Sequence, residues 1–213
     1  MAKSSKKSKS KNQNCQENEW KKVRRKVNRT KRKIEKLEIQ GAQEISVAGL
    51  RVLKEVAEVK GFGVEFALAA EKLIGARPTG ISIYNCMKPI KKKRSIKSID
   101  KVLKYITKAQ QWLSYNGSKL IKNNYVVMTH CHSSSVLNIY KRAVEDHRMF
   151  KVMVTETRPR DQGMKTAKEL VEMGVPIHYM VDSAGPFMVA GCDMVLVGAD
   201  AIRNDGVLNK IGT

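Results

Sequence analysis

Tyr125-Val126-Val127-Met128-Thr129-His130-Cys131-His132-Ser133-Ser134-Ser135 is the stretch that decides how this chain is organised. Its first four residues form an apolar run with the length and the β-branched content of a buried strand. Three serines end it, and the apolar residues 136–140 that follow are predicted to begin a helix. A strand, a polar turn and a helix in this order direct backbone N–H groups and hydroxyls at an anion. The sequence therefore predicts a phosphate-binding turn at Ser133, Ser134 and Ser135.

Cys131 lies within this turn. The dipole of a helix favours the thiolate form of a cysteine near its N-terminus, which makes Cys131 a candidate reactive group. The alternative is an inert buried thiol, because cysteine is among the most buried residue types. His130 and His132 suggest a metal site at first sight, but adjacent residues on an extended backbone point in alternate directions and chelate one ion poorly. No metal is therefore predicted.

Beyond Tyr125 the sequence alternates between short apolar runs and helical segments, which is typical of βαβ units in a parallel sheet. Ligands of such sheets bind beyond the carboxyl ends of the strands, and polar residues follow each predicted strand. Asp200 follows the fourth strand as a candidate acid, and the alternative is a loop or cap aspartate. Asp182 and Ser183 are predicted to cap a helix. The predicted strands are 125–129, 151–155, 177–181 and 194–197, and the predicted helices are 134–146, 164–173 and about 184–190.

Residues from about 17 to 60 are predicted to be helical, because apolar residues recur at three- and four-residue steps, and a further helix is predicted over residues 64–74. Gly41 separates the first two helices, and residues 91–94 are predicted to be a solvated loop. The helix predicted over 98–120 has an apolar face formed by Val102, Leu103, Ile106, Ala109 and Leu113.

Arg77 stands on a loop immediately before Pro78, which favours an extended backbone at Arg77. A guanidinium group on a stiffened loop grips phosphate bidentately, so Arg77 is a candidate phosphate clamp. A plain surface charge is an equally good interpretation of this residue.

The net charge of +21 is concentrated near the N-terminus. Residues 1–33 hold fourteen Lys or Arg and two Glu, a balance of +12, and the other 180 residues carry +9. We expect this Lys- and Ser-rich tail to be disordered, and to be either a solvated tail or a weak RNA-binding arm. The tail has no apolar signal region and no run in the chain approaches the length of a membrane span, which predicts a cytoplasmic protein.

Several motifs occur in one order at close spacing and resemble a known enzyme family. They are Thr129-His130-Cys131-His132-Ser133, Thr155-Glu156-Thr157-Arg158-Pro159, Gln162-Gly163, Val181-Asp182-Ser183-Ala184, Gly198-Ala199-Asp200 and Asn209-Lys210-Ile211-Gly212-Thr213. The family comprises archaeal ribose-1,5-bisphosphate isomerases, 5-methylthioribose-1-phosphate isomerases and the regulatory subunits of the exchange factor for translation initiation factor two. The resemblance covers about residues 34–213.

This resemblance implies an α/β protein with a helical N-terminal domain followed by a Rossmann-like parallel sheet domain, assembled as a homohexamer. The implied domains are a tail at 1–33, a helical domain at 34–122 and a catalytic domain at 123–213. Family members continue well beyond the motif that ends at Thr213, so the sheet domain is expected to be incomplete here.

The resemblance also implies roles for single residues. Cys131 would act on the proton at the sugar C2, and Asp200 would protonate the ring oxygen, with no metal or nucleotide cofactor. Gln40 replaces an arginine of the family's substrate-binding segment, which removes one charge that would clamp a phosphate. The implied substrate contacts are Gln40, Gly41, Ala42, Gln43, Arg77, Ser133, Ser134, Ser135, Asn209 and Lys210.

The predicted function is therefore the isomerisation of ribose 1,5-bisphosphate to ribulose 1,5-bisphosphate in AMP salvage. The regulatory subunits generally lack the pair that Cys131 and Asp200 form, which favours an enzyme. A non-catalytic subunit that binds a translation factor and a methylthioribose-phosphate isomerase are the alternatives.

Overall fold

The computed structural model describes residues 2–78 and 80–209. It consists of two compact units, Met1–Ile106 and Thr107–Thr213. The chain passes from one unit to the other within helix α5 (Ile96–Ser118). The sequence instead predicted a domain boundary after residue 122.

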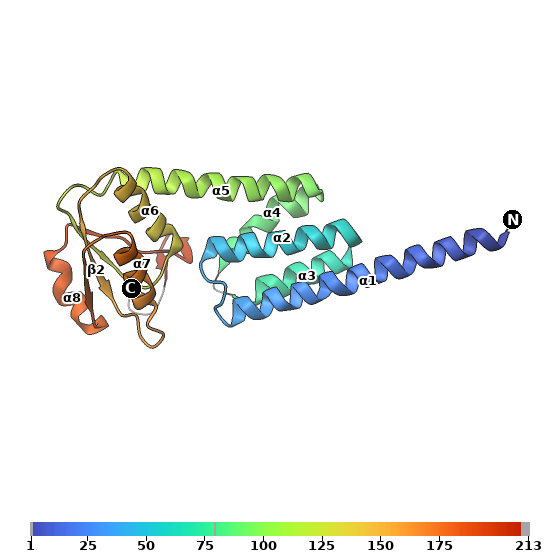
Figure 1. Ribbon diagram of the computed structural model, residues 1–213, viewed down its shortest axis with the longest axis horizontal. Helices are drawn as coiled ribbons and strands as arrows, with labels where there is room; N and C mark the ends of the chain where they lie inside the picture. Colours follow the sequence, from blue (N-terminus) through green and yellow to red (C-terminus); the bar gives the residue numbers. More distant parts are fainter. Residues whose placement is uncertain (1, 79, 210–213) are drawn as a thin grey trace. The chain divides into compact units, whose positions relative to one another are not determined.

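The first unit is helical. Figure 1 shows α1, α2 and α3 side by side, and α4 also packs against α2. Its core is built from apolar residues at helical spacing, such as Leu50, Leu53 and Val56 of α2 and Leu73 of α3, each fully buried. The helices are α1 (Ala2–Glu35), α2 (Ala42–Lys60), α3 (Val64–Gly75), α4 (Ile81–Lys93) and the beginning of α5.

Helix α1 is continuous from Ala2 to Glu35, so it includes both the helical pattern predicted from about residue 17 and the preceding residues that the sequence assigned to a disordered tail. Val23, Val27 and Ile34 lie on one face at four- and seven-residue spacing, and all three are buried in the core of the first unit. Lys and Arg, which dominate the remaining positions, are good helix formers. The boundary after residue 33 therefore falls inside a helix.

Helix α4 was not predicted, and the predicted loop over residues 91–94 includes its last turn. Ile83, Met87 and Ile90 are buried at four- and three-residue steps, which is a helical pattern. Pro89 inside the helix and the cations after it concealed this pattern, because both are typical of loops.

The second unit contains a four-stranded parallel sheet in the order β3-β2-β1-β4, which confirms the predicted α/β architecture. Figure 1 shows α6 and α7 on one side of the sheet and α8 on the other. Val127, Val152 and Val154 face α6 and α7 and form a core with Leu137 and Leu170. The elements are β1 (Val126–Thr129), α6 (Ser134–Glu145), β2 (Lys151–Thr155), α7 (Gln162–Glu172), β3 (Ile177–Met180), η1 (Asp182–Ala184), α8 (Gly185–Met188), η2 (Val189–Gly191), β4 (Met194–Val195), β5 (Ala201–Arg203) and β6 (Gly206–Leu208).

Two features of this unit were not predicted. Strand β4 keeps only Met194 and Val195 of the predicted run, at the end of the described sheet. Strands β5 and β6 then form an antiparallel hairpin, whose turn includes Asn204 and Asp205. Asn and Asp are common in such turns, but the short strands carry no clear alternation.

Candidate functional site

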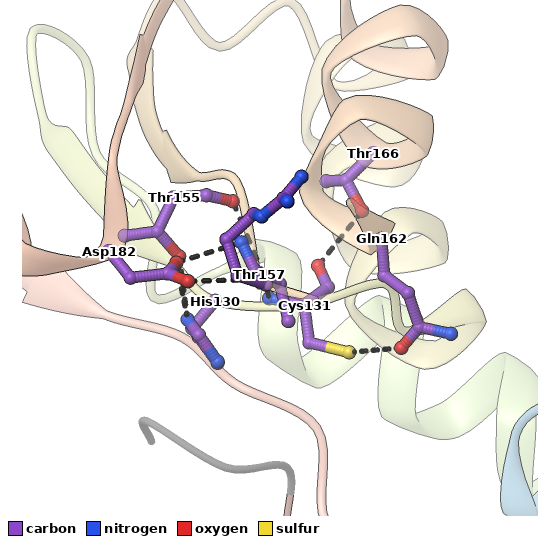
Figure 2. Close-up of polar contacts among 8 residues, drawn as sticks. His130, Cys131, Thr155, Thr157, Gln162, Thr166 and Asp182 are labelled. Carbon is purple, nitrogen blue, oxygen red and sulfur yellow. Dashed lines mark hydrogen bonds and ion pairs between the residues drawn. The ribbon is translucent and has the colours of Figure 1, made fainter. Parts of the chain in front are cut away.

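The carboxyl ends of β1 and β2 meet at one edge of the sheet, because the two strands run parallel with Thr129 opposite Val154. The turn after β1 therefore lies beside the segment that follows β2. Figure 2 shows His130 and Cys131 from the first segment directed at Thr155, Thr157 and the start of α7. The predicted convergence of polar residues is present at this edge.

Cys131 is held at three points by neighbouring segments. Its backbone N–H donates to Thr157 Oγ1 at 2.8 Å, and its carbonyl accepts from Thr166 Oγ1 at 2.9 Å. Its thiol donates to Gln162 Oε1 at 2.9 Å (Figure 2). The side chains Cys131, Thr157, Gln162 and Thr166 are called the thiol cluster below. Cys131 is 4% exposed and has a φ of 71°, a left-handed conformation that is uncommon for a residue with a side chain.

Gly163 brings Gln162 to the thiol. A Cβ atom at Gly163 would lie 1.7 Å from the carbonyl oxygen of Thr155, so the start of α7 approaches the end of β2 more closely than any other residue permits. The Gly163 N–H also donates to the carbonyl of Glu156 at 3.0 Å. This close approach positions the side chain of Gln162 over the turn that carries Cys131.

Asp182 fixes the segment after β2. Its two carboxylate oxygens each accept a backbone N–H at 2.7 Å, from Thr157 and from Arg158. Burial acts to raise the pKa of Asp182, but these two N–H groups and the nearby His130 lower it below its ordinary value. The predicted helix cap at Asp182 is therefore wrong, since η1 has no side-chain cap and the carboxylate binds a neighbouring loop instead.

A pocket of about 210 Å³ opens beside this network, on the α8 side of the sheet. His130 is buried and its Nδ1 lies 2.6 Å from Thr155 Oγ1 and 3.9 Å from Asp182 Oδ1. These polar side chains line one part of an otherwise mainly apolar pocket. The pocket is lined by Met128, Thr129, His130, Thr155, Asp182, Gly185, Pro186, Val189, Val195 and Val197.

His132 points away from His130, into the surface of α7. Its Nδ1 lies 3.2 Å from Thr166 Oγ1, and its Nε2 lies 3.8 Å from Glu169 Oε1. Burial and the charge of Lys165 lower the pKa of His132 from 6.5 to about 4. His132 is therefore neutral at pH 7 and fixes Thr166, the residue that holds the carbonyl of Cys131.

The three serines of the predicted phosphate turn have different surroundings. Ser133 is the N-cap of α6 and its Oγ accepts from the N–H of Val136 at 3.4 Å. Ser135 donates to Gln110 Oε1 of α5 at 3.2 Å. Ser134 is the first residue of α6, where backbone N–H groups have no partner within the helix. The turn thus has the geometry of an anion site, although two hydroxyls also bond within the protein.

Gly198, which follows β4, lies against the serine turn and near Asn209. A Cβ atom at Gly198 would lie 2.7 Å from Ser133 Oγ and 4.0 Å from Asn209 Oδ1. Asp200 stands two residues later, where its N–H donates to the carbonyl of Leu208 at 2.8 Å and closes the β5–β6 hairpin. The predicted partner of Asn209, Lys210, lies outside the described residues.

The other predicted contacts belong to the first unit, at the beginnings of α2 and α4. Gln40 Nε2 donates to the carbonyl of Leu37 at 2.6 Å, and Gly41 has a φ of 80° that only glycine adopts readily. Ser82 of α4 donates to the carbonyl of Ala42 at 2.8 Å, so the two helix N-termini are adjacent. Gln43 lies in the first turn of α2, and the half-buried Arg77 lies in the loop before α4.

The predicted site residues therefore divide between the two units. The second unit holds Cys131, the serine turn, Asp200 and Asn209, and the first unit holds Arg77 and the segment from Gln40 to Gln43. No sequence argument gave a role to Thr155, Thr157, Gln162, Thr166 or His130, although the family motifs include most of them. Threonine at the end of a predicted strand and glutamine at the start of a predicted helix were the sequence features that could have indicated these contacts.

Within residues 2–78 and 80–209, no group of three or more His, Cys, Asp or Glu side chains is arranged to hold a metal ion. No described helix is long and apolar enough to cross a membrane.

Comparison with known proteins identifies the family. The family model described as the Initiation factor 2 subunit family matches residues 38–213. The chain belongs to this family. Ribose 1,5-bisphosphate isomerase of Archaeoglobus fulgidus is 37% identical over 195 residues, which cover 85% of this chain and 62% of the relative. The protein of the same name from Haloferax volcanii is 37% identical over 205 residues, which cover 88% of this chain and 64% of the relative. The chain thus spans less than two thirds of the length of these relatives.

Solved structures share the fold. A structure described as translation initiation factor eIF-2B from Pyrococcus horikoshii OT3 matches with a TM-score of 0.78 and 26% identity, over 87% of this chain and 70% of that chain. The 5-methylthioribose 1-phosphate isomerase from the same organism matches with a TM-score of 0.64 and 22% identity, over 87% of this chain and 61% of that chain. The second likeness concerns the fold alone.

Proposed function

We propose that this chain carries the isomerase site of a ribose 1,5-bisphosphate isomerase, which converts that aldose to ribulose 1,5-bisphosphate in AMP salvage. The observation that carries the proposal is a buried cysteine at the end of β1, whose backbone is held by Thr157 and whose thiol is held by Gln162, in a chain similar to archaeal enzymes of that name. An aldose phosphorylated at C1 is locked as a ring, so its isomerisation needs an acid for the ring oxygen and a base for the C2 hydrogen.

In this proposal Asp200 donates its proton to the ring oxygen as the bond from that oxygen to C1 breaks. Cys131, as the thiolate, removes the hydrogen from C2, and an enol forms between C1 and C2. The C2 hydroxyl then returns a proton to Asp200 while Cys131 delivers its proton to C1, which leaves a ketone at C2 and both phosphates in place. Each residue ends in its starting state, so the cycle needs no external acid, base or oxidant.

Each unit has helix N-termini that suit a phosphate. In the second unit, the serine turn at the start of α6 would offer backbone N–H groups, with Asn209 and Lys210 as further contacts. In the first unit, the N-termini of α2 and α4 are adjacent, and Arg77 and the segment from Gln40 to Gln43, which precede or begin these helices, would contact a substrate phosphate. Gln40 supplies an amide where the resemblance implies a guanidinium, so we expect weaker binding of that phosphate.

The test is turnover of ribose 1,5-bisphosphate by the chain and by matched variants, with the product detected as ribulose 1,5-bisphosphate. We expect Cys131→Ser and Asp200→Asn each to lower kcat by about 10²- to 10⁴-fold. The control is Cys192→Ser, which changes a half-buried thiol on the other side of the sheet and should leave kcat unchanged. Loss of activity in the control alone, or turnover that survives both site variants, would contradict the proposal.

A second candidate is a non-catalytic subunit that associates with a translation initiation factor, favoured by the likeness to the Pyrococcus horikoshii eIF-2B structure. Absence of turnover together with tight association to purified initiation factor two supports this candidate against the first. Turnover of 5-methylthioribose 1-phosphate in preference to ribose 1,5-bisphosphate would instead assign the third branch of the family.

The proposal extends to the assembly and location of the protein. We expect a homohexamer in the cytoplasm, with a weak RNA contact through the basic residues 1–33. Sedimentation velocity tests the homohexamer. Removal of residues 2–16, which precede the buried Val23, tests the RNA contact by its effect on RNA affinity.

A further inference from the structure

Two large aromatic side chains of α5 are exposed in the second unit, and a lysine lies over each ring. Trp112 is 63% exposed, with Lys108 Nζ 5.7 Å from its ring centroid. Tyr115 is 49% exposed, with Lys119 Nζ 3.7 Å from its ring centroid. Positions 108, 112, 115 and 119 follow steps of four, three and four residues. The two rings therefore lie between the two lysines along one face of α5 and the turn after it.

Helix α6 contributes a further cation to this face. The guanidinium carbon of Arg142 lies 5.9 Å from the ring centroid of Tyr115. Asp146 holds it there, with Oδ1 3.0 Å from Arg142 Nη2, and also accepts from Ser118 Oγ at 3.1 Å. The side chains enclose a hollow of about 590 Å³ lined by Gln111, Trp112, Tyr115, Asn116 and Arg142. The α5 face is defined here as Lys108, Gln111, Trp112, Tyr115, Asn116, Lys119 and Arg142.

The segment that contains this face is free of acidic residues. Residues 101–144 hold no Asp or Glu, between Asp100 and Glu145. Among the residues that the structure describes, no ion pair is recorded for Lys108 or Lys119, and each ammonium group lies over an aromatic ring without a carboxylate partner. The seven cations of the segment are Lys101, Lys104, Lys108, Lys119, Lys122, Lys141 and Arg142.

The positive charge of the α5 face indicates which class of partner it can bind. A second copy meeting the same face would bring lysine against lysine, which is unfavourable. An apolar protein partner would remove the ammonium groups from water without replacing their hydration. A single-stranded nucleic acid matches both features, because its phosphates pair with the lysines and its bases stack on the rings. The amides of Gln111 and Asn116 lie where they can bond to base edges.

We propose that the α5 face binds single-stranded nucleic acid, with bases stacked on Trp112 and Tyr115 and phosphates bound by Lys108, Lys119 and Arg142. This site is separate from the thiol cluster and from the basic residues 1–33. Residues 1–33 contain Trp20 as their one aromatic residue, whereas the α5 face has two neighbouring rings between its cations.

The experiment measures binding of the full chain to fluorescent dodecamers of uridine and of deoxythymidine by anisotropy. Replacing one platform, by Trp112→Ala or Tyr115→Ala, should weaken binding about tenfold, and replacing both about a hundredfold. Trp112→Phe should restore most of the affinity because it keeps a ring. Lys108→Ala with Lys119→Ala should reduce the slope of log affinity against log salt by about 1.4. A difference between the two dodecamers identifies RNA or DNA as the ligand.

Two controls separate stacking from simple attraction of a polyanion. Phe187→Ala removes an exposed ring, 87% exposed, elsewhere in the same unit and should leave affinity unchanged. Inorganic polyphosphate has the charge but no bases, so its binding should not respond to the loss of Trp112 and Tyr115. Equal binding of the dodecamers by the wild type and the double aromatic variant overturns the proposal. Loss of self-association in that variant, without any change in dodecamer binding, also overturns it and assigns the face to a protein contact.

Discussion

The thiol cluster and the α5 face lie in the same unit, but they differ in how they are held. Hydrogen bonds to other chain segments fix the side chains of the cluster, whereas the rings of the α5 face are largely exposed. Every member of the thiol cluster bonds to another chain segment, and Cys131 adopts a left-handed backbone conformation at 4% exposure. The rings of the α5 face are about half exposed or more, and the contacts recorded for them are with the cations of Lys108, Lys119 and Arg142 that lie over them. Substitutions in the cluster should therefore change stability and chemistry together, whereas substitutions on the face should change binding alone.

The largest effect should come from Gly163→Ala, which tests whether the cluster depends on backbone packing. The added methyl group would meet the carbonyl oxygen of Thr155 at 1.7 Å, so α7 or β2 must move. We expect a loss of about 3 kcal/mol or more in the free energy of unfolding, measured by urea denaturation. Gly191→Ala is the matched control, since a Cβ atom there has no neighbour within 4 Å. A small loss in Gly163→Ala would mean that the cluster adapts easily.

The next effect concerns pH and the support of Thr166. The pKa of His132 is about 4 in the folded chain and 6.5 as the ordinary value. Between these values the unfolded chain binds a proton that the folded chain does not, so stability falls as the pH is lowered from 6.5 to 4, by up to about 3 kcal/mol. His132→Gln removes this titration and should flatten the plot of unfolding free energy against pH. Parallel plots for the two proteins would show that His132 is not held neutral.

A smaller effect should follow from loss of the contact between Gln162 and the thiol. Gln162→Ala removes the acceptor of the Cys131 S–H, and we expect a loss of about 1 kcal/mol in unfolding free energy. A double-mutant cycle with Cys131→Ala isolates the pair, and its coupling energy should be favourable. Gln111→Ala on the α5 face is the comparison, with an expected change below about 0.5 kcal/mol. A coupling energy of zero would remove Gln162 from the thiol cluster.

The smallest expected change in stability concerns an exposed ring of the α5 face, compared with a buried ring of the same unit. Trp112→Ala should change the free energy of unfolding by less than about 0.5 kcal/mol, because the ring is 63% exposed. The buried aromatic Tyr140 of α6, which stacks on Phe150, is the comparison, and Tyr140→Ala should lose about 3–5 kcal/mol. A large loss in Trp112→Ala would give that ring a structural role and weaken the inference of a ligand.

The sheet and the turn after β1 were predictable because their signals are local. Apolar, β-branched runs at Val126–Thr129 and Lys151–Thr155 are typical of buried strands, and serines before an apolar segment are typical of an N-cap. The position of Cys131 at a strand end follows directly from these two signals.

The contacts that hold the site were not predictable, because they depend on the close approach of distant segments. The contact of Gln162 with Cys131 requires Gly163 against Thr155, and Asp182 bonds to a loop more than twenty residues earlier in the chain. Nothing in the spacing of these residues specifies such distances. In α4 the local pattern was misleading as well, because burial of Ile83, Met87 and Ile90 stabilises a helix that contains Pro89.

The sequence did not predict the exposed α5 face, because the apolar residues of this part of α5 were expected to be packed against a core. Ala109 and Leu113 were predicted to lie on the apolar face of the helix with Ile106, but both are exposed, and only the earlier residues pack against the core of the first unit. The apolar pattern continues past the point where α5 leaves that core. Periodicity alone does not reveal where a helix loses its packing partner.

The contact of Gly198 with Ser133 leaves no room for even one methyl group, and it joins the two strand ends from which the thiol and the carboxylate extend. A methyl group at position 198 would therefore have to displace Ser133, the N-cap of α6, or the segment that leads to Asp200 and its hairpin. In the proposed acid–base pair of Cys131 and Asp200, the separation of the two groups would thus depend on a residue that belongs to neither of them.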